Sequence, residues 1–261
     1  MRTRLSAALN GVELNSIDPA ICIQSIDEDA PNMDVSVGNR SGNNGQHLNG
    51  VYRKTMDVSI QFSIDVPKRE TIRRASILQQ VTAWAASGGN LTVNYRDRQK
   101  LRVACVGLPS IDGMDRWTSN YEIVFRAFQV PYWVSQDAES ATISAGTSGS
   151  ATLRLRESAG GKLCFEATNG SGSTVNDVTV SANGRTITFA SLGLANGEKL
   201  IGDYDDNDIQ RLRILNGSTY RSVLDKRTGA DDVLLKYGGN TVSVTSGAAL
   251  SWKVYTYGRW E

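Results

Sequence analysis

The sequence predicts a mainly β protein built from two differently composed halves, with one helix in the first half. Three observations support this prediction. Residues 58–66 alternate between apolar and polar side chains, residues 68–86 carry an amphipathic helical pattern, and the second half is a series of short alternating runs. All five prolines precede residue 135, whereas sixteen of the 25 glycines follow it. This change in composition indicates two separately built domains.

The clearest predicted strand lies in the first half. Apolar side chains occupy every second position: Val58, Ile60, Phe62, Ile64 and Val66. A period of two places one face of a strand against a core and leaves the other face in solvent. Pro67 ends this strand, because proline cannot donate to the ladder of hydrogen bonds in a sheet.

A helix is predicted over residues 68–86. Its apolar positions follow the spacing of one helix face: Ile77, Leu78, Val81, Trp84 and Ala85. Pro67 suits the helix start and Gly88-Gly89 suits a C-terminal cap, so about five turns of helix are expected across a sheet. A hairpin of residues 91–95 and 101–106 follows, and then a strand over 121–128 that leads into Pro131-Tyr132-Trp133.

A long polar segment lies upstream of the predicted strand. Residues 27–50 (DEDAPNMDVSVGNRSGNNGQHLNG) contain few side chains that could fill a core. A polar loop of this length in a compact domain is usually functional or mobile. We therefore expect residues 27–53 to form an arm that becomes ordered against a neighbouring molecule.

The second half is expected to be a β-sandwich or jelly roll that needs no helix. Asn183-Gly184, Asn196-Gly197 and Asn216-Gly217 supply turn signals between its short runs. The runs cover residues 151–156, 162–167, 175–182, 186–190, 199–201, 209–215, 220–224, 233–237, 241–244 and 250–257. Residues 135–150 are small and polar, and they suit a linker or a first edge strand. We expect one domain over 1–135 and a second over 136–261.

Charge and cysteine content argue against several classes of protein. The formal net charge of +1 gives no electrostatic case for binding nucleic acid or a membrane surface. Cys22, Cys105 and Cys164 lie in short apolar runs, and their odd number without CxxC spacing argues against a disulfide framework or a zinc site. We expect buried, reduced thiols and folding in a reducing cytosol. No signal peptide or membrane span is expected.

No motif supports catalysis, so we expect no enzyme activity, no cofactor and no metal ion. His47 is the only histidine, and we expect it in an exposed polar loop that cannot hold catalytic geometry. Asp203, Asp205 and Asn207 match three positions of a calcium-binding loop, but Asp208 replaces the required glycine. An acidic β-turn is expected there, with a weak cation site as the alternative.

A basic stripe is predicted on the hairpin, where every second position from 96 to 102 is basic: Arg96, Arg98, Lys100 and Arg102. Such a stripe can contact phosphates, but Tyr95 is its only aromatic neighbour. We favour a solvated hairpin tip or a salt-bridging contact between subunits. Contact with passing DNA is the alternative.

The order of these elements resembles the distal tail protein (Dit) family of long-tailed, siphovirus-type bacteriophages. The resemblance rests on the strand at 55–66, the helix at 68–86, the hairpin at 91–106, the strand at 121–128 ending in Pro-Tyr-Trp, and the glycine-rich β domain. Residues 197–203 (GEKLIGD) resemble the family's strand into an acidic turn, and residues 253–257 (KVYTY) form the closing strand. The resemblance implies a tail-tube-like β-sandwich with one flanking α-helix, followed by a galectin-like or jelly-roll β-sandwich.

The same resemblance implies a structural protein of the virion, assembled in the host bacterial cytoplasm. Copies of the chain would form a hexameric ring at the tail tip or baseplate, around a channel for DNA. The implied partners are the tail tube protein, the tape-measure protein and the tail-tip hub or receptor-binding protein, with DNA only as passing cargo and no membrane insertion. The candidate residues for the contact between subunits are Arg40, Tyr52, Arg53, Asp57, Ser59 and Gln61.

A carbohydrate-binding, lectin-like adhesion module is the alternative function. Aromatic residues of the second half could stack on sugar rings: Trp252, Trp260, Tyr204, Tyr220, Tyr237, Tyr255 and Tyr257. Core or interface positions explain most of them more simply. Residues 136–261 also contain no histidine, so the sugar-contacting residues of true galectins are absent.

Overall fold

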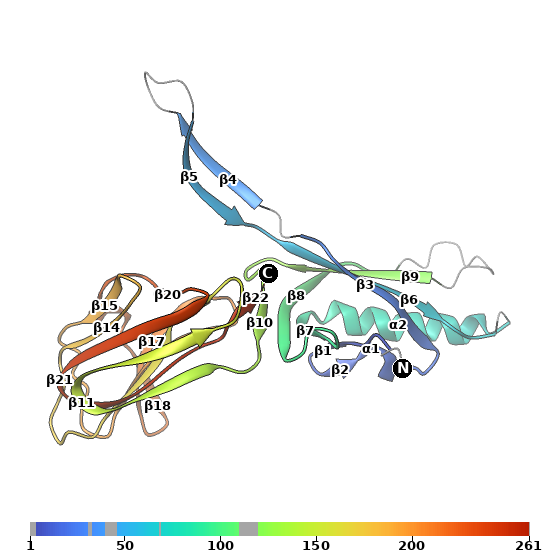
Figure 1. The fold of residues 1–261 in the computed structure, drawn as a ribbon. Coiled ribbons are helices and arrows are strands. Elements are labelled where there is room, and N and C mark those ends of the chain that lie inside the picture. The colour runs from blue at the N-terminus through green and yellow to red at the C-terminus, as the bar shows by residue number, and fades with distance from the viewer. Residues whose placement is uncertain (1–3, 31–32, 40–45, 68, 110–119, 261) are drawn as a thin grey trace. The chain divides into compact units, whose positions relative to one another are not determined.

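The computed structural model describes residues 4–30, 33–39, 46–67, 69–109 and 120–260, with the backbone alone for 38–39 and 46–52. The chain forms two compact units, residues 1–133 and residues 134–261. Strands dominate both units, and helices contribute only a few short segments and one long one (Figure 1). The prediction of a mainly β protein with one substantial helix is confirmed.

The first unit is built on a sheet whose strands follow the order β2-β1-β7-β8-β9-β6-β3. These strands are β1 (Ala7–Leu9), β2 (Val12–Glu13), β3 (Ile21–Glu28), β6 (Met56–Ile64), β7 (Gly89–Val93), β8 (Gln99–Gly107) and β9 (Asn120–Ala127). The alternation predicted for β6 is confirmed, because five of its side chains are buried: Met56, Val58, Ile60, Phe62 and Ile64. The polar side chains between them therefore lie on the opposite face of the sheet.

Helix α2 (Thr71–Ala86) covers the buried face of this sheet, and the short helix α1 (Leu14–Ile17) precedes β3 (Figure 1). Four residues of the predicted helix face are buried: Ile77, Leu78, Val81 and Ala85. Trp84, the fifth residue of that face, is only half-buried. Its Nε1 donates a hydrogen bond to the Val12 carbonyl at 2.9 Å. Its ring meets the ring of Phe125 edge-on at 5.9 Å, which connects the helix to β9.

The helix begins later than predicted. The Pro67 carbonyl accepts a hydrogen bond from the Glu70 N–H at 2.8 Å, and the helix begins at Thr71. Its end is as predicted, because Gly88 and Gly89 have φ angles of +56° and +122°. Glycine adopts this left-handed region without the steric cost that a Cβ brings.

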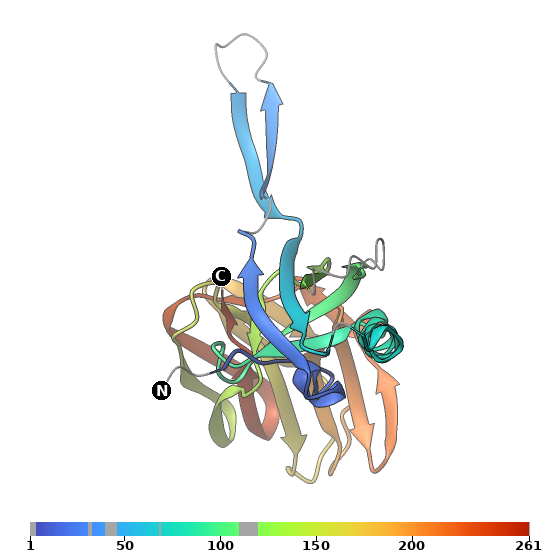
Figure 2. The same ribbon diagram turned by 90° about the vertical axis from the view of Figure 1, so that its right-hand side faces the viewer.

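Most of the predicted polar arm is a β-hairpin. Strands β4 (Met33–Asn39) and β5 (Gln46–Arg53) pair with each other and, within the described chain, with no other strand. Figures 1 and 2 show the hairpin continuing from the ends of β3 and β6. Of the arm or loop that the sequence suggests, the structure forms an arm, in which hydrogen bonds across the hairpin satisfy the backbone.

The second unit is a sandwich with the strand order β18-β17-β16-β13-β21-β14-β15-β19, and β11 lies beside β21. Its strands are β11 (Glu139–Leu155), β13 (Cys164–Asn169), β14 (Val178–Ala182), β15 (Arg185–Phe189), β16 (Lys199–Tyr204), β17 (Gln210–Asn216), β18 (Thr219–Ser222), β19 (Arg227–Gly229) and β21 (Gly238–Thr256). The shorter elements are β10 (Trp133–Ser135), β12 (Gly161–Lys162), the 3-10 helix η1 (Leu224–Lys226), β20 (Leu234–Leu235) and β22 (Arg259–Trp260).

One long strand connects the two layers of this sandwich. The sequence predicts separate strands at 241–244 and 250–257, but β21 is continuous over 19 residues. Residues 242–246 of β21 pair with β14, and residues 250–255 pair with β13. Within the part of the chain that the structure describes, β11 pairs only with β21, with register shifts between Ile143 and Ser148. The shifts let both strands bend from one layer into the other. The sequence allows a linker or a first edge strand over residues 135–150, and most of this segment belongs to the edge strand β11.

The core of the second unit is centred on aromatic rings. The centroid of the Phe165 ring lies 6.3 Å from that of Phe189 and 6.3 Å from that of Trp252. The turn between β14 and β15 follows its Asn-Gly sequence, since Asn183 and Gly184 have φ angles of +52° and +76°. The predicted turn signal is thus confirmed at this hairpin.

The expectation that all three cysteines are buried was wrong for two of them. None forms a disulfide, and Cys164 is buried, but Cys22 and Cys105 are only partly buried. Cys22 lies at an outward position of β3, since its neighbours Ile21 and Ile23 are buried. Cys105 lies at an inward position near the end of β8, since its neighbours Ala104 and Val106 are exposed. For Cys22, the position in the strand, rather than an apolar neighbourhood in sequence, decides the exposure.

We expect Phe165→Ala to lower the free energy of unfolding by about 3–5 kcal/mol, because it leaves a cavity beneath two aromatic rings. Chemical unfolding followed by circular dichroism measures this change. Thr188→Ala, on the solvent side of β15, is the matched control and is expected to change stability by about 0.5 kcal/mol or less. Equal effects from the two substitutions would contradict the assigned core.

Candidate functional surfaces

The solvent face of β6 carries three of the predicted contact residues. Asp57 is half-buried and accepts two hydrogen bonds of 2.6 Å from the guanidinium of Arg126 on β9. These bonds raise the pKa of Arg126 above its usual value. Ser59 and Gln61 follow on the same face. Asp57 is thus neutralised within its own chain, and Ser59 and Gln61 leave an uncharged polar strip beside it.

The remaining predicted contact residues belong to the arm. Arg40 lies outside the described residues. Tyr52 lies in β5, where the structure describes the backbone alone. Arg53, at the end of β5, is half-buried, and its guanidinium lies 4.8 Å from the centre of the Tyr132 ring. This cation–π contact links the root of the arm to the Pro-Tyr-Trp segment.

The arm presents apolar side chains that the sequence analysis did not assign a role. Met33, Val35 and Val37 alternate along β4, so they share one face, and their exposed fractions are 52%, 53% and 46%. An isolated two-stranded hairpin is at best marginally stable in water. The exposed apolar row therefore makes this hairpin face the strongest candidate for contact with another molecule.

A cluster centred on Glu28 was missed from the sequence. Glu28 ends β3, and its carboxylate accepts hydrogen bonds from Tyr95 Oη at 2.7 Å, from Arg96 at 2.6 and 3.2 Å, and from Trp133 Nε1 at 2.9 Å. The Arg96 guanidinium lies 5.5 Å from the centre of the Trp133 ring. Burial, and then the hydrogen bond to Glu28, raise the pKa of Tyr95 above its usual value.

The predicted basic stripe is therefore not a simple solvated tip. Arg96 pairs with Glu28, with side-chain exposures of 24% and 15%, so this charge is used inside the first unit. Strands β9 and β6 separate β8 from β3 in the sheet, so the β7–β8 turn reaches the end of β3 only because the sheet curls. No local sequence pattern marks Glu28, because its partners are about 70 and 100 residues away.

His47 was expected in a loop, but it lies in β5 and pairs in register with Gly38. Its side chain is outside the description. No group of three His, Cys, Asp or Glu side chains in the described chain is arranged to hold a metal ion. Across the same residues, no helix combines the length and hydropathy needed to cross a membrane.

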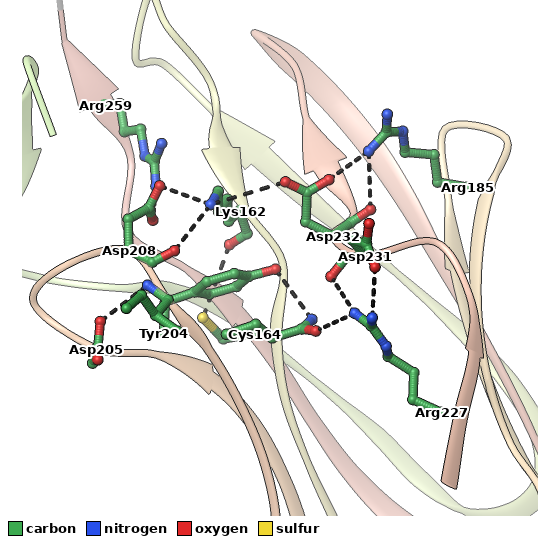
Figure 3. A network of polar contacts seen from close by, with 12 residues as sticks. Lys162, Cys164, Arg185, Tyr204, Asp205, Asp208, Arg227, Asp231, Asp232 and Arg259 are labelled. Atoms are coloured by element: carbon green, nitrogen blue, oxygen red, sulfur yellow. Dashed lines mark hydrogen bonds and ion pairs between the residues drawn. The ribbon is translucent and has the colours of Figure 1, made fainter. Parts of the chain in front are cut away.

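The acidic segment after β16 is tied to its own chain. Asp208 Oδ2 lies 2.7 Å from Lys162 Nζ, and Asp208 Oδ1 lies 2.5 Å from the Arg259 guanidinium (Figure 3). Lys162 also lies 3.9 Å from Asp232 and 4.7 Å from the centre of the Tyr204 ring. Lys162, which follows two glycines, is therefore a structural cation at this end of the sandwich.

Two further carboxylates of this acidic region, those of Asp203 and Asp205, are also engaged. Asp203 pairs with Arg211 at 3.2 Å and with Arg213 at 2.6 Å. Asp205 Oδ1 accepts the backbone N–H groups of Asn207 at 2.9 Å and Ile209 at 3.0 Å. This geometry is that of an acidic β-turn, in which the carboxylate of Asp205 stabilises the turn.

Cys164 lies buried beside this network (Figure 3). Burial raises the pKa of its thiol to about 12, and the negative charge of Asp203 adds to the shift. A thiol that stays protonated at neutral pH is a poor nucleophile and a poor metal ligand. Cys164 is accordingly a core residue.

Solved structures supply the comparison for this arrangement. No protein-family model matches the sequence, and no curated protein matches it in sequence. The structure of the Dit protein of phage SPP1 matches with a TM-score of 0.67 and 10% identity, over 97% of this chain and 98% of that one. Two structures of the phage P2 baseplate in its activated conformation, with Ca and with Sr, match with TM-scores of 0.50 and 0.51.

Both baseplate matches are 8% identical to this chain and cover at least 97% of each chain. At such low identity the likeness establishes the fold. The chain has a Dit-like tail-protein fold over nearly its whole length, as the order of elements in the sequence predicts.

We expect Glu28→Gln to lower the free energy of unfolding of the first unit by about 1.5–3 kcal/mol. The amide replaces one acceptor oxygen with a donor that faces the N–H groups of Arg96 and Trp133. Urea unfolding followed by tryptophan fluorescence measures the change. Asp27→Asn is the matched control, because Asp27 is exposed, and it is expected to change stability by about 0.5 kcal/mol or less.

We expect a variant with Cys22→Ser and Cys105→Ser, which keeps only Cys164, to resist a thiol reagent at pH 8 and to react on unfolding. The folded pKa of about 12 lies above the ordinary value of 9.0, so the neutral thiol favours the folded state below pH 9. This contribution is lost as the pH rises from 9 towards 12. Rapid labelling of the folded variant at pH 8 would contradict the burial.

Proposed function

We propose that the chain is a structural component of a bacteriophage tail tip and has no enzymatic role. The observation that carries the proposal is the likeness to SPP1 Dit over nearly the full length of both chains. That protein is described as a paradigm of the hub adsorption apparatus of phages that infect Gram-positive bacteria. In this proposal, residues 1–135 form the ring and residues 136–261 form an outer domain, and the protein is part of the virion.

A closed ring suits the free edges of the first unit. Strand β3 ends the described sheet and pairs only with β6, and the hairpin β4–β5 pairs with no further strand among the described residues. Unpaired strand edges promote uncontrolled association unless they are covered. Six copies in a head-to-tail ring would cover each such edge with the next copy and leave none exposed.

The arm is the surface best suited to contact the neighbouring copy. Met33, Val35 and Val37 would lose their exposed apolar area there, which stabilises the complex by about 25 cal/mol for each Å² removed from water. Ser59 and Gln61 offer hydrogen-bonding groups without a charge to desolvate. We place the contact on these residues and on Tyr52, Arg53 and Asp57 at its edge.

The ring would surround a channel through which DNA passes without binding. A net charge of +1 gives little attraction to phosphates. Arg96 and Asp57 are already paired within the chain, which lowers the charge available to a passing polyanion. The tail tube and tape-measure proteins on one side, and the hub or receptor-binding protein on the other, are the proposed partners.

We expect the purified chain to form six-fold rings in negative-stain images and a hexamer by native mass spectrometry. Val35→Asp should shift the population to monomers, because it places a charge in the proposed apolar contact. Thr142→Asp is the matched control: it adds the same charge to an exposed residue of β11 in the second unit and should leave the rings intact. A wild-type chain that is monomeric at all concentrations and within tail particles would contradict the proposal.

A further inference from the structure

One face of the second unit carries rows of hydroxyl side chains. In the segment 241–245 (TVSVT) of β21, Thr241, Ser243 and Thr245 are exposed, whereas Val242 and Val244 are buried. Segments 178–182 (VTVSA) of β14 and 186–188 (TIT) of β15 also bury their apolar residues, and their Ser and Thr residues are exposed or partly exposed on the other side. In segment 148–152 (SGSAT) of β11, Ser148, Ser150 and Thr152 are exposed, and the small residues between them are partly buried. None of these four segments contains a charged residue. We call their outward Ser and Thr residues the hydroxyl face.

The strand register brings these side chains together. Ser243 lies opposite Ser150 on one side and opposite Ser181 on the other, and Ser181 also lies opposite Thr186. Neighbouring strands are about 4.8 Å apart and alternate residues about 6.7 Å apart, so the hydroxyl groups form a regular array. In the described chain, only Ser181 of this array donates a hydrogen bond, at 3.4 Å to the Ser243 carbonyl. The other hydroxyl groups face solvent.

An open pocket of about 760 Å³ lies at one end of the hydroxyl face. Thr152 belongs to both, which makes the two continuous. Arg154, Arg156 and Glu139 also line the pocket, and so does Tyr237, whose exposed fraction is 72%. An aromatic ring this exposed, beside charged groups in a concave site, is the arrangement that binds a ligand with both apolar and polar faces.

The pocket is open because β21 begins with two glycines. Gly238 and Gly239 lie opposite Leu155 and Arg154, so no side chain of β21 fills the space beside Arg154. The side chains of Arg154, Arg156 and Glu139 make no hydrogen bond or ion pair with another described residue. Their polar groups remain available to a ligand.

We propose that the hydroxyl face and its pocket bind an extended neutral polysaccharide. A sugar chain presents hydroxyl groups that both donate and accept, as Ser and Thr do, and the C–H face of a sugar ring stacks on an aromatic ring such as Tyr237. The pocket contains two arginines and two glutamates, Glu139 and Glu157, so it attracts neither a polyanion nor a polycation. The hydroxyl face lacks the aromatic and apolar anchors of a protein interface.

This site goes beyond the structural role proposed above and does not depend on it. It uses only residues of the second unit and none of the arm or of β6. Sugar binding and ring formation can therefore succeed or fail separately, and imaging of the same samples distinguishes the two outcomes.

Affinity electrophoresis of the full-length chain tests the site, in gels that contain amylose, soluble β-1,3-glucan or galactomannan, with polygalacturonate as the anionic counterpart. We expect retardation by at least one neutral polymer and none by polygalacturonate. Tyr237→Ala should weaken that retardation about tenfold in Kd, because it removes the stacking surface. Ser243→Asp should weaken it as well, because it puts an unmatched charge in the centre of the hydroxyl face.

Tyr220→Ala is the matched control. Tyr220 is 55% exposed on β18 and lies outside both the pocket and the hydroxyl face, so its loss should leave retardation unchanged. Circular dichroism of each variant verifies the fold. Absence of retardation by every neutral polymer, retardation by polygalacturonate alone, or equal losses in Tyr237→Ala and Tyr220→Ala would each overturn the inference, whether or not rings are seen.

Discussion

The carboxylate of Glu28 holds together three parts of the first unit that are far apart in the sequence: the end of β3, the β7–β8 turn and Trp133. A carboxylate this little exposed is tolerated because hydrogen-bond donors surround it. Removal of the carboxylate would leave the donors of Tyr95, Arg96 and Trp133 without this acceptor. The contact requires a curled sheet. It also anchors the end of β3 from which the arm continues, and it encloses Trp133, the last residue of the unit.

The curled sheet leaves different faces for different purposes. α2 covers one face with buried aliphatic side chains, while the other face presents polar groups, the exposed carboxylates of Asp27 and Glu122 and the Asp57–Arg126 pair. The arm adds an exposed apolar row at one edge. In the proposed ring, this arm would offer apolar area for association between copies.

Elements with a strong local pattern were predictable. The alternation in β6, the helix face of α2 and the Asn183-Gly184 turn each depend on residues a few positions apart, so the sequence shows them directly. The hairpin β4–β5 was missed because the alternation of Met33, Val35 and Val37 covers only five residues of a mainly polar segment. Continuity of β21 was missed because a glycine and small residues interrupt its pattern, where the strand bends between layers.

The sequence alone predicted the fold class, the order of the main elements and the likeness to distal tail proteins, because burial periodicity survives at 10% identity when individual residues do not. Of the predicted contact residues, it did not reveal that Asp57 is paired within its own chain. The three-dimensional arrangement revealed that pairing, the role of Glu28, and the meeting of Thr152 with Arg154 and Tyr237 at one pocket. Each depends on strand register and sheet curvature, because these bring together residues that lie far apart in the sequence and that no local pattern connects.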